Sequence, residues 1–336
     1  GFLECKLKAK KYRKAKKFFE KEMSIVAPEF QHMVKQEVSV EALSEMLTRL
    51  YLLYCVKRKK FEKIIQKIQP KVILEVVSYN LDCMIFNEIA YEKKINTIEL
   101  QHGVMSGSIA YYYPKNVLIK QFPQKVFLFS DYWKNCISVP LEDKNVISVG
   151  YPYFEEQVKK YQKINCDKNK TTKVILFLSQ WTIGENFSKF AVEFNNLING
   201  KWKIIYKLHP GEYANWKRYP WLVNSGIEVV DSLRHNIYEY FAVSNVQVGV
   251  SSTAIFEGLG FGLDTFIFNT VSAECMKRLC QDGFAAEVNS AKELADKLEK
   301  NIKSKKNKDK LFWKENAFNN LCVEINKCID STTACS

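Results

Sequence analysis

The sequence lacks most of the patterns that would place it in a common class. No apolar run among its 336 residues approaches the roughly 20 residues of a membrane-spanning helix, and we expect no secretory signal because residues 1–20 have no apolar stretch. The ten cysteines form no CxxC pair and match no zinc spacing, which favours free thiols in a reducing, cytoplasmic setting. Gly-x-Gly-x-x-Gly, Walker, Gly-x-Ser-x-Gly and His-Glu-x-x-His motifs are missing, and no Asp-x-Asp pair could hold a metal against a diphosphate. We therefore expect no metal and no resident cofactor.

What the sequence does have is apolar residues and an excess of positive charge. Hydrophobic residues make up 47% of the chain, which is enough for a full core. The net charge is +13, and residues 1–17 contribute +7 of it through eight Lys and Arg against Glu4. A solvated helix face explains such a run, and attraction to an anionic membrane surface is the functional alternative. No RNP, KH, zinc-finger or helix-turn-helix signature is present, so we expect no nucleic-acid partner.

The order of the apolar patterns predicts helices first, and then strands that alternate with helices. Residues 3–67 have helical spacing, with breaks expected at Pro28 and Ser39. The short β-branched runs that follow are typical of a doubly wound parallel sheet. The expected strands are 72–77, 96–100, 125–129, 146–149, 174–178, 202–207, 227–230, the run that ends at Val250, and 265–268. The expected helices lie near 82–93, 186–199, 236–242, 291–303 and 310–330.

The alternation is interrupted once, and this interruption divides the chain. Residues 153–172 are polar and Lys-rich with little apolar pattern, so we interpret them as a linker. We therefore predict an α/β protein with two Rossmann-like domains that face a central cleft, preceded by extra N-terminal helices. The first domain would occupy 1–152 together with those helices, the second 173–303, and a C-terminal helix and tail 304–336. The chain begins with Gly1, and we expect a trimmed or partial chain.

Three short stretches directly follow predicted strands and carry the candidate chemistry. They are Gln101-His102-Gly103, His209-Pro210-Gly211 and Ser251-Ser252-Thr253. Ligands of open α/β sheets bind at the carboxyl ends of the strands, so these stretches would meet in one cleft. The serines would begin a helix, whose first N–H groups and positive dipole end hold a phosphate well. The structural alternatives are an ordinary helix cap and two ordinary turn histidines.

Further candidates lie around these stretches. Ser179 and Gln180 begin the loop after the strand 174–178 and would join the phosphate-binding set. Glu257, on the helix after Ser252, would accept both ribose hydroxyls unless it simply faces solvent. Imidazole can accept a proton near neutral pH, so His102 is the first candidate for the general base. Asp131 is the second, and a third group comprises Tyr79, Asn80 and Asp82.

The acceptor is expected in the first domain. The residues that would contact it are Gln101, Gly103, Tyr79, Asn80 and Tyr112. Tyr112 belongs to a loop, residues 110–114, in which three consecutive tyrosines suit stacking on a sugar or would simply pack.

At these motifs the chain resembles bacterial surface-polysaccharide transferases of GT-B architecture. Residues 98–103 are similar to the His-Gly element of CDP-glycerol glycerophosphotransferase-like proteins, and residues 206–210 to the His-Pro motif that those proteins share with sialyl- and Kdo-transferases. Residues 250–257 resemble their paired-serine motif, and the resemblance spans about residues 70–290. It implies a metal-independent, inverting transfer from a cytidine-activated donor. By resemblance, His209, Ser251 and Ser252 would hold the nucleotide phosphate, and His102 would be the base.

We therefore predict a glycosyltransferase of capsule or lipopolysaccharide-type glycan synthesis. Its donor would be CMP- or CDP-activated (sialic acid-like, Kdo-like or glycerol phosphate), bound as a substrate by the second domain. Its acceptor would be an oligosaccharide or a lipid-linked glycan, met in the cytoplasm at the inner face of the cell membrane. Two alternatives stay open. One is a UDP-sugar transferase or nucleotide-sugar 2-epimerase of the same fold, and the other is a non-catalytic, membrane-associated glycan-binding protein.

Overall fold

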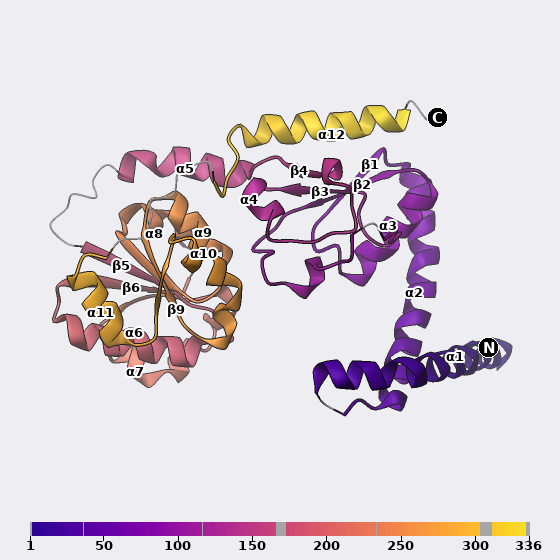
Figure 1. The fold of residues 1–336 in the computed structure, drawn as a ribbon, viewed down its shortest axis with the longest axis horizontal. Helices are drawn as coiled ribbons and strands as arrows, with labels where there is room; N and C mark the ends of the chain where they lie inside the picture. The colour runs from indigo at the N-terminus through magenta and orange to yellow at the C-terminus, as the bar shows by residue number, and fades with distance from the viewer. Residues whose placement is uncertain are drawn as a thin grey trace. The chain divides into compact units, whose positions relative to one another are not determined.

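The chain folds into two compact units, each with parallel β-strands (Figure 1). The structure is a computed structural model that describes residues 2–35, 37–115, 117–165, 173–232, 234–302 and 311–333. Unit 1 comprises residues 1–99, 119–124 and 328–336, and unit 2 comprises residues 100–118 and 125–327. Two parallel sheets with helices confirm the predicted α/β class. In the described residues no helix is both long and apolar enough to cross a membrane.

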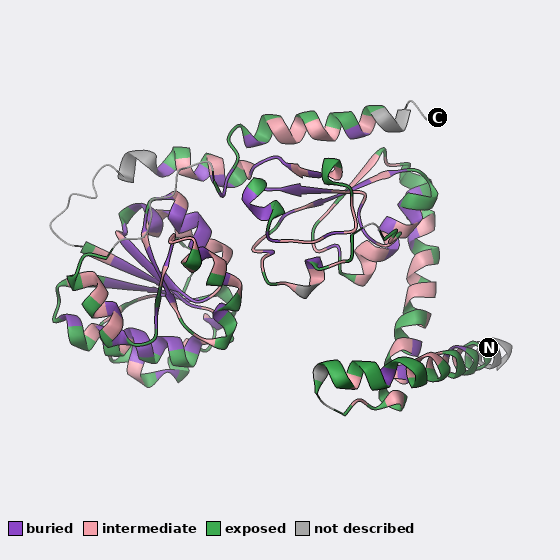
Figure 2. Ribbon diagram, in the orientation of Figure 1, coloured by how far each residue is buried: buried purple, intermediate pink, exposed green. Residues whose placement is uncertain are grey.

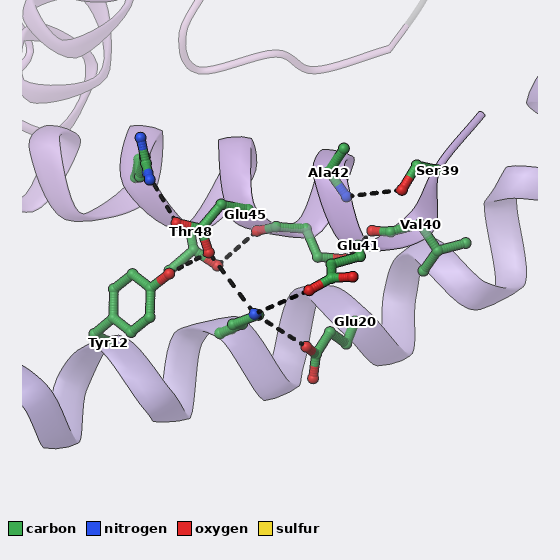
Figure 3. Close-up of polar contacts among 11 residues, drawn as sticks. Tyr12, Glu20, Ser39, Val40, Glu41, Ala42, Glu45 and Thr48 are labelled. Carbon is green, nitrogen blue, oxygen red and sulfur yellow. Dashed lines mark hydrogen bonds and ion pairs between the residues drawn. The ribbon is translucent and has the colours of Figure 1, made fainter.

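Unit 1 begins with two long helices, α1 (Phe2–Val34) and α2 (Val40–Ile68), that pack on each other. Figure 3 shows their polar contacts. The Tyr12 hydroxyl donates to Glu45, and the Lys16 ammonium lies 3.8 Å from Glu45 and 3.9 Å from Glu41. Ser39 caps α2 by accepting the Ala42 N–H at 3.1 Å, which confirms the break predicted there.

The second predicted break, at Pro28, is wrong because α1 continues through this residue. Proline removes one helix donor and crowds the preceding turn. Contacts on both sides of Pro28 hold the helix in place. Ala27 is buried, and the Gln31 side-chain amide donates to the Val38 carbonyl at 3.0 Å. Tertiary packing therefore outweighs the local cost of the proline.

The first sheet is built from parallel strands. In unit 1, β1 (Val72–Glu75) pairs in parallel with β2 (Asn96–Leu100), and α3 (Leu81–Glu92) connects them. In unit 2, β3 (Lys125–Leu128) pairs in parallel with β4 (Val146–Ser148). The strand order of this sheet is β1-β2-β3-β4. Short helices η1 (Ile109–Tyr111), α4 (Asp131–Lys134) and η2 (Asp143–Asn145) complete the region.

Helix α5 (Pro152–Asn165) occupies most of the segment that was predicted as a linker. Its Phe154 and Tyr161 are buried, and the Phe154 ring lies 6.1 Å from the Tyr238 ring of α8 (Ile237–Val243). These two anchors are too few to give a clear apolar period among the many polar residues of the segment, which explains why its helix was missed. Residues 166–172 lie outside the described residues.

The second sheet, in unit 2, contains six parallel strands in the order β10-β9-β8-β5-β6-β7. Their bounds are β5 (Lys173–Leu178), β6 (Trp202–Lys207), β7 (Glu228–Val230), β8 (Val246–Gly249), β9 (Asp264–Phe268) and β10 (Ala286–Val288). Only β10 was not predicted. Figure 2 shows these strands as the buried centre of the unit. Helices cover both faces, with α6 (Gly184–Ile198) and α11 (Ala291–Glu299) on one side and α8 and α9 (Thr253–Gly260) on the other (Figure 1).

The core of this sheet is aromatic on the α6 side. Phe187, Phe190 and Phe194 recur at helical spacing along α6, and their ring centroids lie 5.7, 6.0 and 5.8 Å from that of Phe177 in β5. Such pairs add to the stabilisation that burial of the rings provides. The other helices of unit 2 are η3 (Pro210–Glu212), η4 (Trp216–Arg218), α7 (Pro220–Val223), η5 (Val271–Met276) and α10 (Lys277–Gln281), and α12 (Ala317–Thr333) follows at the C-terminal end.

On the opposite face, a buried amide joins β8, α9 and β9. The Gln247 side-chain amide donates to the Ile255 carbonyl at 2.7 Å and to the Thr265 hydroxyl at 2.9 Å. Gly258 of α9 gives it room, because a Cβ at this position would lie 2.0 Å from the Gln247 side-chain oxygen. The position of α9 on the sheet is therefore set by hydrogen bonds as well as by apolar packing.

Candidate functional site

The paired serines lie where β8 ends and α9 begins, as predicted. Ser252 caps α9, since its hydroxyl accepts the Ala254 N–H at 3.2 Å. The Ser251 hydroxyl donates to the side-chain oxygen of Gln180 at 3.0 Å, which links the ends of β8 and β5. Both serines are partly exposed. The predicted phosphate-binding residues Ser251 and Gln180 therefore lie side by side, next to the positive end of a helix.

The turn after β2, residues 101–104, also reaches this helix end. The Val104 N–H donates to the Thr253 hydroxyl at 3.1 Å, and a Cβ at Gly103 would lie 2.9 Å from the same oxygen. Gln101 is buried and holds the turn, accepting the Phe129 N–H at 2.8 Å and donating to the Gly103 carbonyl at 2.9 Å. Gln101 and Gly103 thus shape the turn, and their predicted contact with an acceptor stays a prediction.

The His102 side chain itself is exposed at this turn. No described residue forms a hydrogen bond with its ring. Both ring nitrogens are therefore open to a ligand, so the role of general base stays a prediction for His102.

The turn after β6, residues 209–212, is built as a capping box. The His209 ring accepts the Gly211 N–H through Nδ1 at 3.1 Å, and a Glu212 carboxylate oxygen accepts the His209 N–H at 3.0 Å. Because Nδ1 accepts a hydrogen bond, the neutral ring carries its hydrogen on Nε2. His209 therefore presents a donor, Nε2–H, on an exposed side chain.

Glu212 connects this turn to the start of α6. The residue is 2% exposed, and its second carboxylate oxygen has no hydrogen-bond partner among the described residues. A Cβ at Gly184, the first residue of α6, would lie 2.1 Å from this oxygen and 2.7 Å from the Tyr219 hydroxyl. Gly184 is therefore needed for the carboxylate to lie against the first turn of α6, where the helix dipole favours a negative charge.

A cavity of about 610 Å³ lies at the carboxyl ends of β5 and β6. Its lining includes four predicted phosphate-binding residues and the first turn of α9. It also includes three cations and, among its described residues, one carboxylate, Glu239, which pairs with His235 at 2.9 Å. The lining residues with a predicted role are Ser179, His209, Pro210 and Ser252, and the cations are Lys160, Lys207 and Arg234. The cavity therefore has the charge and the donors to hold a phosphate.

Lys207 is the main residue of this cavity that sequence reasoning missed. It is 8% exposed, donates to the Tyr213 hydroxyl and to the Leu208 carbonyl at 3.3 Å, and lies 4.7 Å from the centre of the Tyr213 ring. Burial lowers the pKa of its ammonium group. Lys207 ends β6 and Arg234 follows β7, so the rule used for the histidines would have found both.

Glu257 does not face solvent, so that alternative is wrong. It is 8% exposed, and burial raises the pKa of its carboxyl group to about 7. Tyr238 donates a hydrogen bond to it, and the carboxylate in turn raises the pKa of the Tyr151 phenol, which burial already raises. The side chain is not among the residues that line the cavity. Contact with ribose hydroxyls stays a prediction.

The two lesser candidates in unit 2 lie outside this cavity. Asp131 is exposed at the start of α4, accepts the Ser148 hydroxyl at 2.6 Å and pairs with Lys134 at 2.9 Å. These contacts hold the pKa of its carboxyl group below the ordinary range, which weakens it as a base. In the tyrosine loop, Tyr111 is buried while Tyr112 is 68% exposed, so one packs and the other is open to a ligand.

The candidates of unit 1 have structural partners. Asn80 caps α3 by accepting the Asp82 N–H at 2.9 Å, Asp82 pairs with Lys57, and Tyr79 is exposed. Sequence reasoning missed the neighbouring Glu75, which lies opposite Glu99 in the pairing of β1 with β2. Burial, together with the nearby Glu99, raises the pKa of the Glu75 carboxyl group to about 7. A carboxyl group with such a pKa suits proton transfer near neutral pH.

Comparison with known proteins supports the fold. No protein-family model and no curated protein sequence matches the chain. Among solved structures, UDP-GlcNAc 2-epimerase of Neisseria meningitidis bound to UDP-GlcNAc aligns with a TM-score of 0.58 and 12% identity, over 84% of this chain and 82% of that one. The Methanocaldococcus jannaschii UDP-GlcNAc 2-epimerase in complex with UDP-GlcNAc and UDP gives 0.55 and 15%, over 82% and 80%. A glycosyltransferase from Rickettsia africae gives 0.52 and 17%, over 83% and 82%. The chain thus has a GT-B-like fold.

Proposed function

We propose that this protein is an enzyme that acts on a nucleotide-activated sugar and binds its phosphates in the cavity beside His209. The observation that carries the proposal is the meeting of His209, Ser252 and Lys207 around one cavity at the carboxyl ends of parallel strands. A cavity of about 610 Å³ lies within the ordinary range for a ligand site.

The chemistry follows from the donors around the cavity. His209 offers Nε2–H, and α9 offers the positive end of its dipole beside Ser252. Hydrogen bonds hold the Lys207 ammonium in place, and a bound phosphate would favour its charged form, against the effect of burial on its pKa. Such preorganised donors stabilise the charge that develops on a leaving nucleotide. His102, whose exposed ring is free, would accept the proton of the attacking group.

UDP is the nucleotide that we propose. The two epimerases of similar fold were solved with UDP-GlcNAc, whereas none of these comparisons supports the CMP or CDP donor expected from the sequence. Both a UDP-sugar transferase and a 2-epimerase suit the cavity. They differ in a measurable way, because a transferase needs an acceptor and releases UDP, while an epimerase converts UDP-GlcNAc without one.

A thermal-shift experiment with UDP, CDP and CMP tests the proposal, because a ligand that binds only the folded state raises the melting temperature. We expect UDP to give the largest shift. His209→Ala should weaken UDP binding about 10- to 100-fold, the scale of one hydrogen bond to a charged group. His32→Ala, which removes an exposed histidine of α1, is the matched control. A larger shift with CMP or CDP would favour the cytidine-activated donor that the sequence predicts. No shift with any nucleotide would favour the non-catalytic glycan-binding protein.

The acceptor and the membrane remain part of the proposal. Helix α1 exposes Lys10, Lys11 and Lys14 together with Phe18 and Ile25, a mixture suited to an anionic lipid surface. A lipid-linked acceptor would be found at such a surface. Co-sedimentation with vesicles that contain anionic lipid, compared with neutral vesicles, tests this part separately.

A further inference from the structure

A second cavity in unit 2 is not used by the proposed chemistry. Its volume is about 530 Å³, and it lies between the first turn of α6 and the segment that contains η4 and α7. It shares no lining residue with the first cavity. Trp181, which lines the second cavity, lies close to Gly211 of that turn, since a Cβ at Gly211 would be 3.8 Å from the Trp181 ring.

Three aromatic residues, Trp181, Tyr219 and Trp221, are among the nine that line this second cavity, and most of the others are polar. The Trp181 indole is 63% exposed, which is unusual for a large apolar ring without a partner surface. Trp221 is held in place, because its ring N–H donates to the Ser188 hydroxyl at 3.0 Å and the Lys189 ammonium lies 4.7 Å from its centre. Tyr219 is buried beneath the guanidinium of Arg218, 5.0 Å from the ring centre.

Polar side chains stand between these rings. Thr182 and Asn186 are exposed and offer hydroxyl and amide groups that both donate and accept. Arg218 donates to the Tyr219 hydroxyl at 2.7 Å, and its guanidinium has further N–H donors. The Glu185 carboxylate pairs with Lys189 at 2.7 Å. Aromatic faces bordered by small polar groups match the two surfaces of a sugar ring, which has apolar C–H faces and a rim of hydroxyls.

We infer that this second cavity binds a saccharide residue at a site separate from the nucleotide. The inference depends on the proposed function in one respect only. An enzyme that extends a glycan chain has use for a second sugar site, whereas an epimerase of a single nucleotide-sugar does not. Occupation of the second cavity by a saccharide would therefore favour the transferase over the epimerase.

Titration of the full chain with soluble oligosaccharides, in the absence of nucleotide, tests the inference. The probes are chitotriose, maltotriose and an α2,8-linked sialic acid trimer, which differ in N-acetylation and charge. Stacking on the exposed Trp181 should quench tryptophan fluorescence and shift it to shorter wavelength. We expect saturation with at least one probe. Isothermal titration calorimetry does not need Trp181 as a reporter. By this measurement, Trp181→Ala and Asn186→Ala should each weaken that binding about tenfold or more, as the loss of a central contact does.

Two controls separate the outcomes. Trp202→Phe removes a tryptophan that lies outside both cavities and should bind the probe normally. His209→Ala should lose nucleotide binding and keep saccharide binding, so failure of one proposal is distinguishable from failure of the other. The inference is overturned if no probe saturates below about 10 mM, a bound that corresponds to very weak association. It is equally overturned if both cavity variants, folded by circular dichroism, bind as the wild type does.

Discussion

The turns at His102 and His209 have similar sequences but different anchors. Each follows a parallel strand, and each has an exposed histidine with a glycine one or two residues later. The first is held by a neutral amide, Gln101, and leaves the histidine ring without a partner among the described residues. The second is held by a buried carboxylate, Glu212, and fixes the histidine through Nδ1.

This difference assigns different chemistry to the two histidines. A ring that its own turn holds in one tautomer serves as a fixed donor, which suits binding of a phosphate. A ring without such a bond can exchange a proton, which suits a base. Each turn also reaches the start of α9, the first through Thr253 and the second through the cavity that Ser252 lines. The following predictions test this contrast.

The largest effect is expected at the first turn. His102→Ala should lower turnover about 100- to 10,000-fold, the range that a general base contributes, while UDP affinity changes less than about twofold. The measurements are product formation from UDP-GlcNAc and a UDP titration. Asp131→Asn is the matched comparison and should keep most activity. If His102→Ala retains activity and Asp131→Asn loses it, the assignment of His102 as the general base is wrong.

At the second turn, Gly184→Ala should disturb the anchor without touching a histidine. The new Cβ would meet the Glu212 carboxylate at 2.1 Å, so we expect the free energy of unfolding to fall by roughly 1–3 kcal/mol and UDP affinity to weaken. Urea unfolding and the UDP titration measure the two effects. Gly200→Ala is the control, because a Cβ there meets nothing within 4 Å and only the positive φ of +74° opposes it. Equal UDP affinity in the two variants would show that Glu212 does not position His209.

The last prediction concerns Glu257 in α9, the helix that both turns reach. Its pKa is raised from 4.5 to about 7, so the folded state holds this proton more tightly than the unfolded state does. The stability that this provides is present below about pH 4.5 and is lost as the pH rises through about 7. Because a glutamine at this position cannot ionise, the Glu257→Gln variant should not lose this stability. Its free energy of unfolding should exceed that of the wild type by an amount that grows over this pH interval to about 3 kcal/mol. Urea unfolding at several pH values measures it, and a constant difference would contradict the assignment.

Much of the fold could be predicted because the spacing of apolar residues along a short stretch of sequence already distinguishes strands from helices. Strands β2 and β6 match their predicted bounds, since both are short β-branched runs between polar turns. Strand β10 has no β-branched run, because Val288 is its only β-branched residue, and α5 carries too few buried residues to show its period. Pro28 was misplaced because packing between α1 and α2, which no local rule describes, keeps the helix intact.

The site residues that lie at strand ends could be predicted from the sequence. The residues whose role depends on how deeply their side chains are buried could not. The strand-end rule located Ser179, His209 and Ser252, which line one cavity. It could not show that Glu257 is buried, or that the buried Glu212 carboxylate accepts a hydrogen bond from the His209 backbone N–H. Burial of a single polar residue is decided by segments far away in the chain. The second cavity likewise combines residues 181–186 with residues 218–221, and neither stretch carries a motif alone.

The bonds of Gln247 bear on how a ligand could be accommodated. This amide, on β8, forms hydrogen bonds with α9 and β9, and Gly258 packs closely against it. The helix and the sheet should therefore move as one rigid body. Any conformational change on substrate binding should then occur in the loops that surround α9. Variation of those loops, with the helix left untouched, is the natural route to a changed substrate preference.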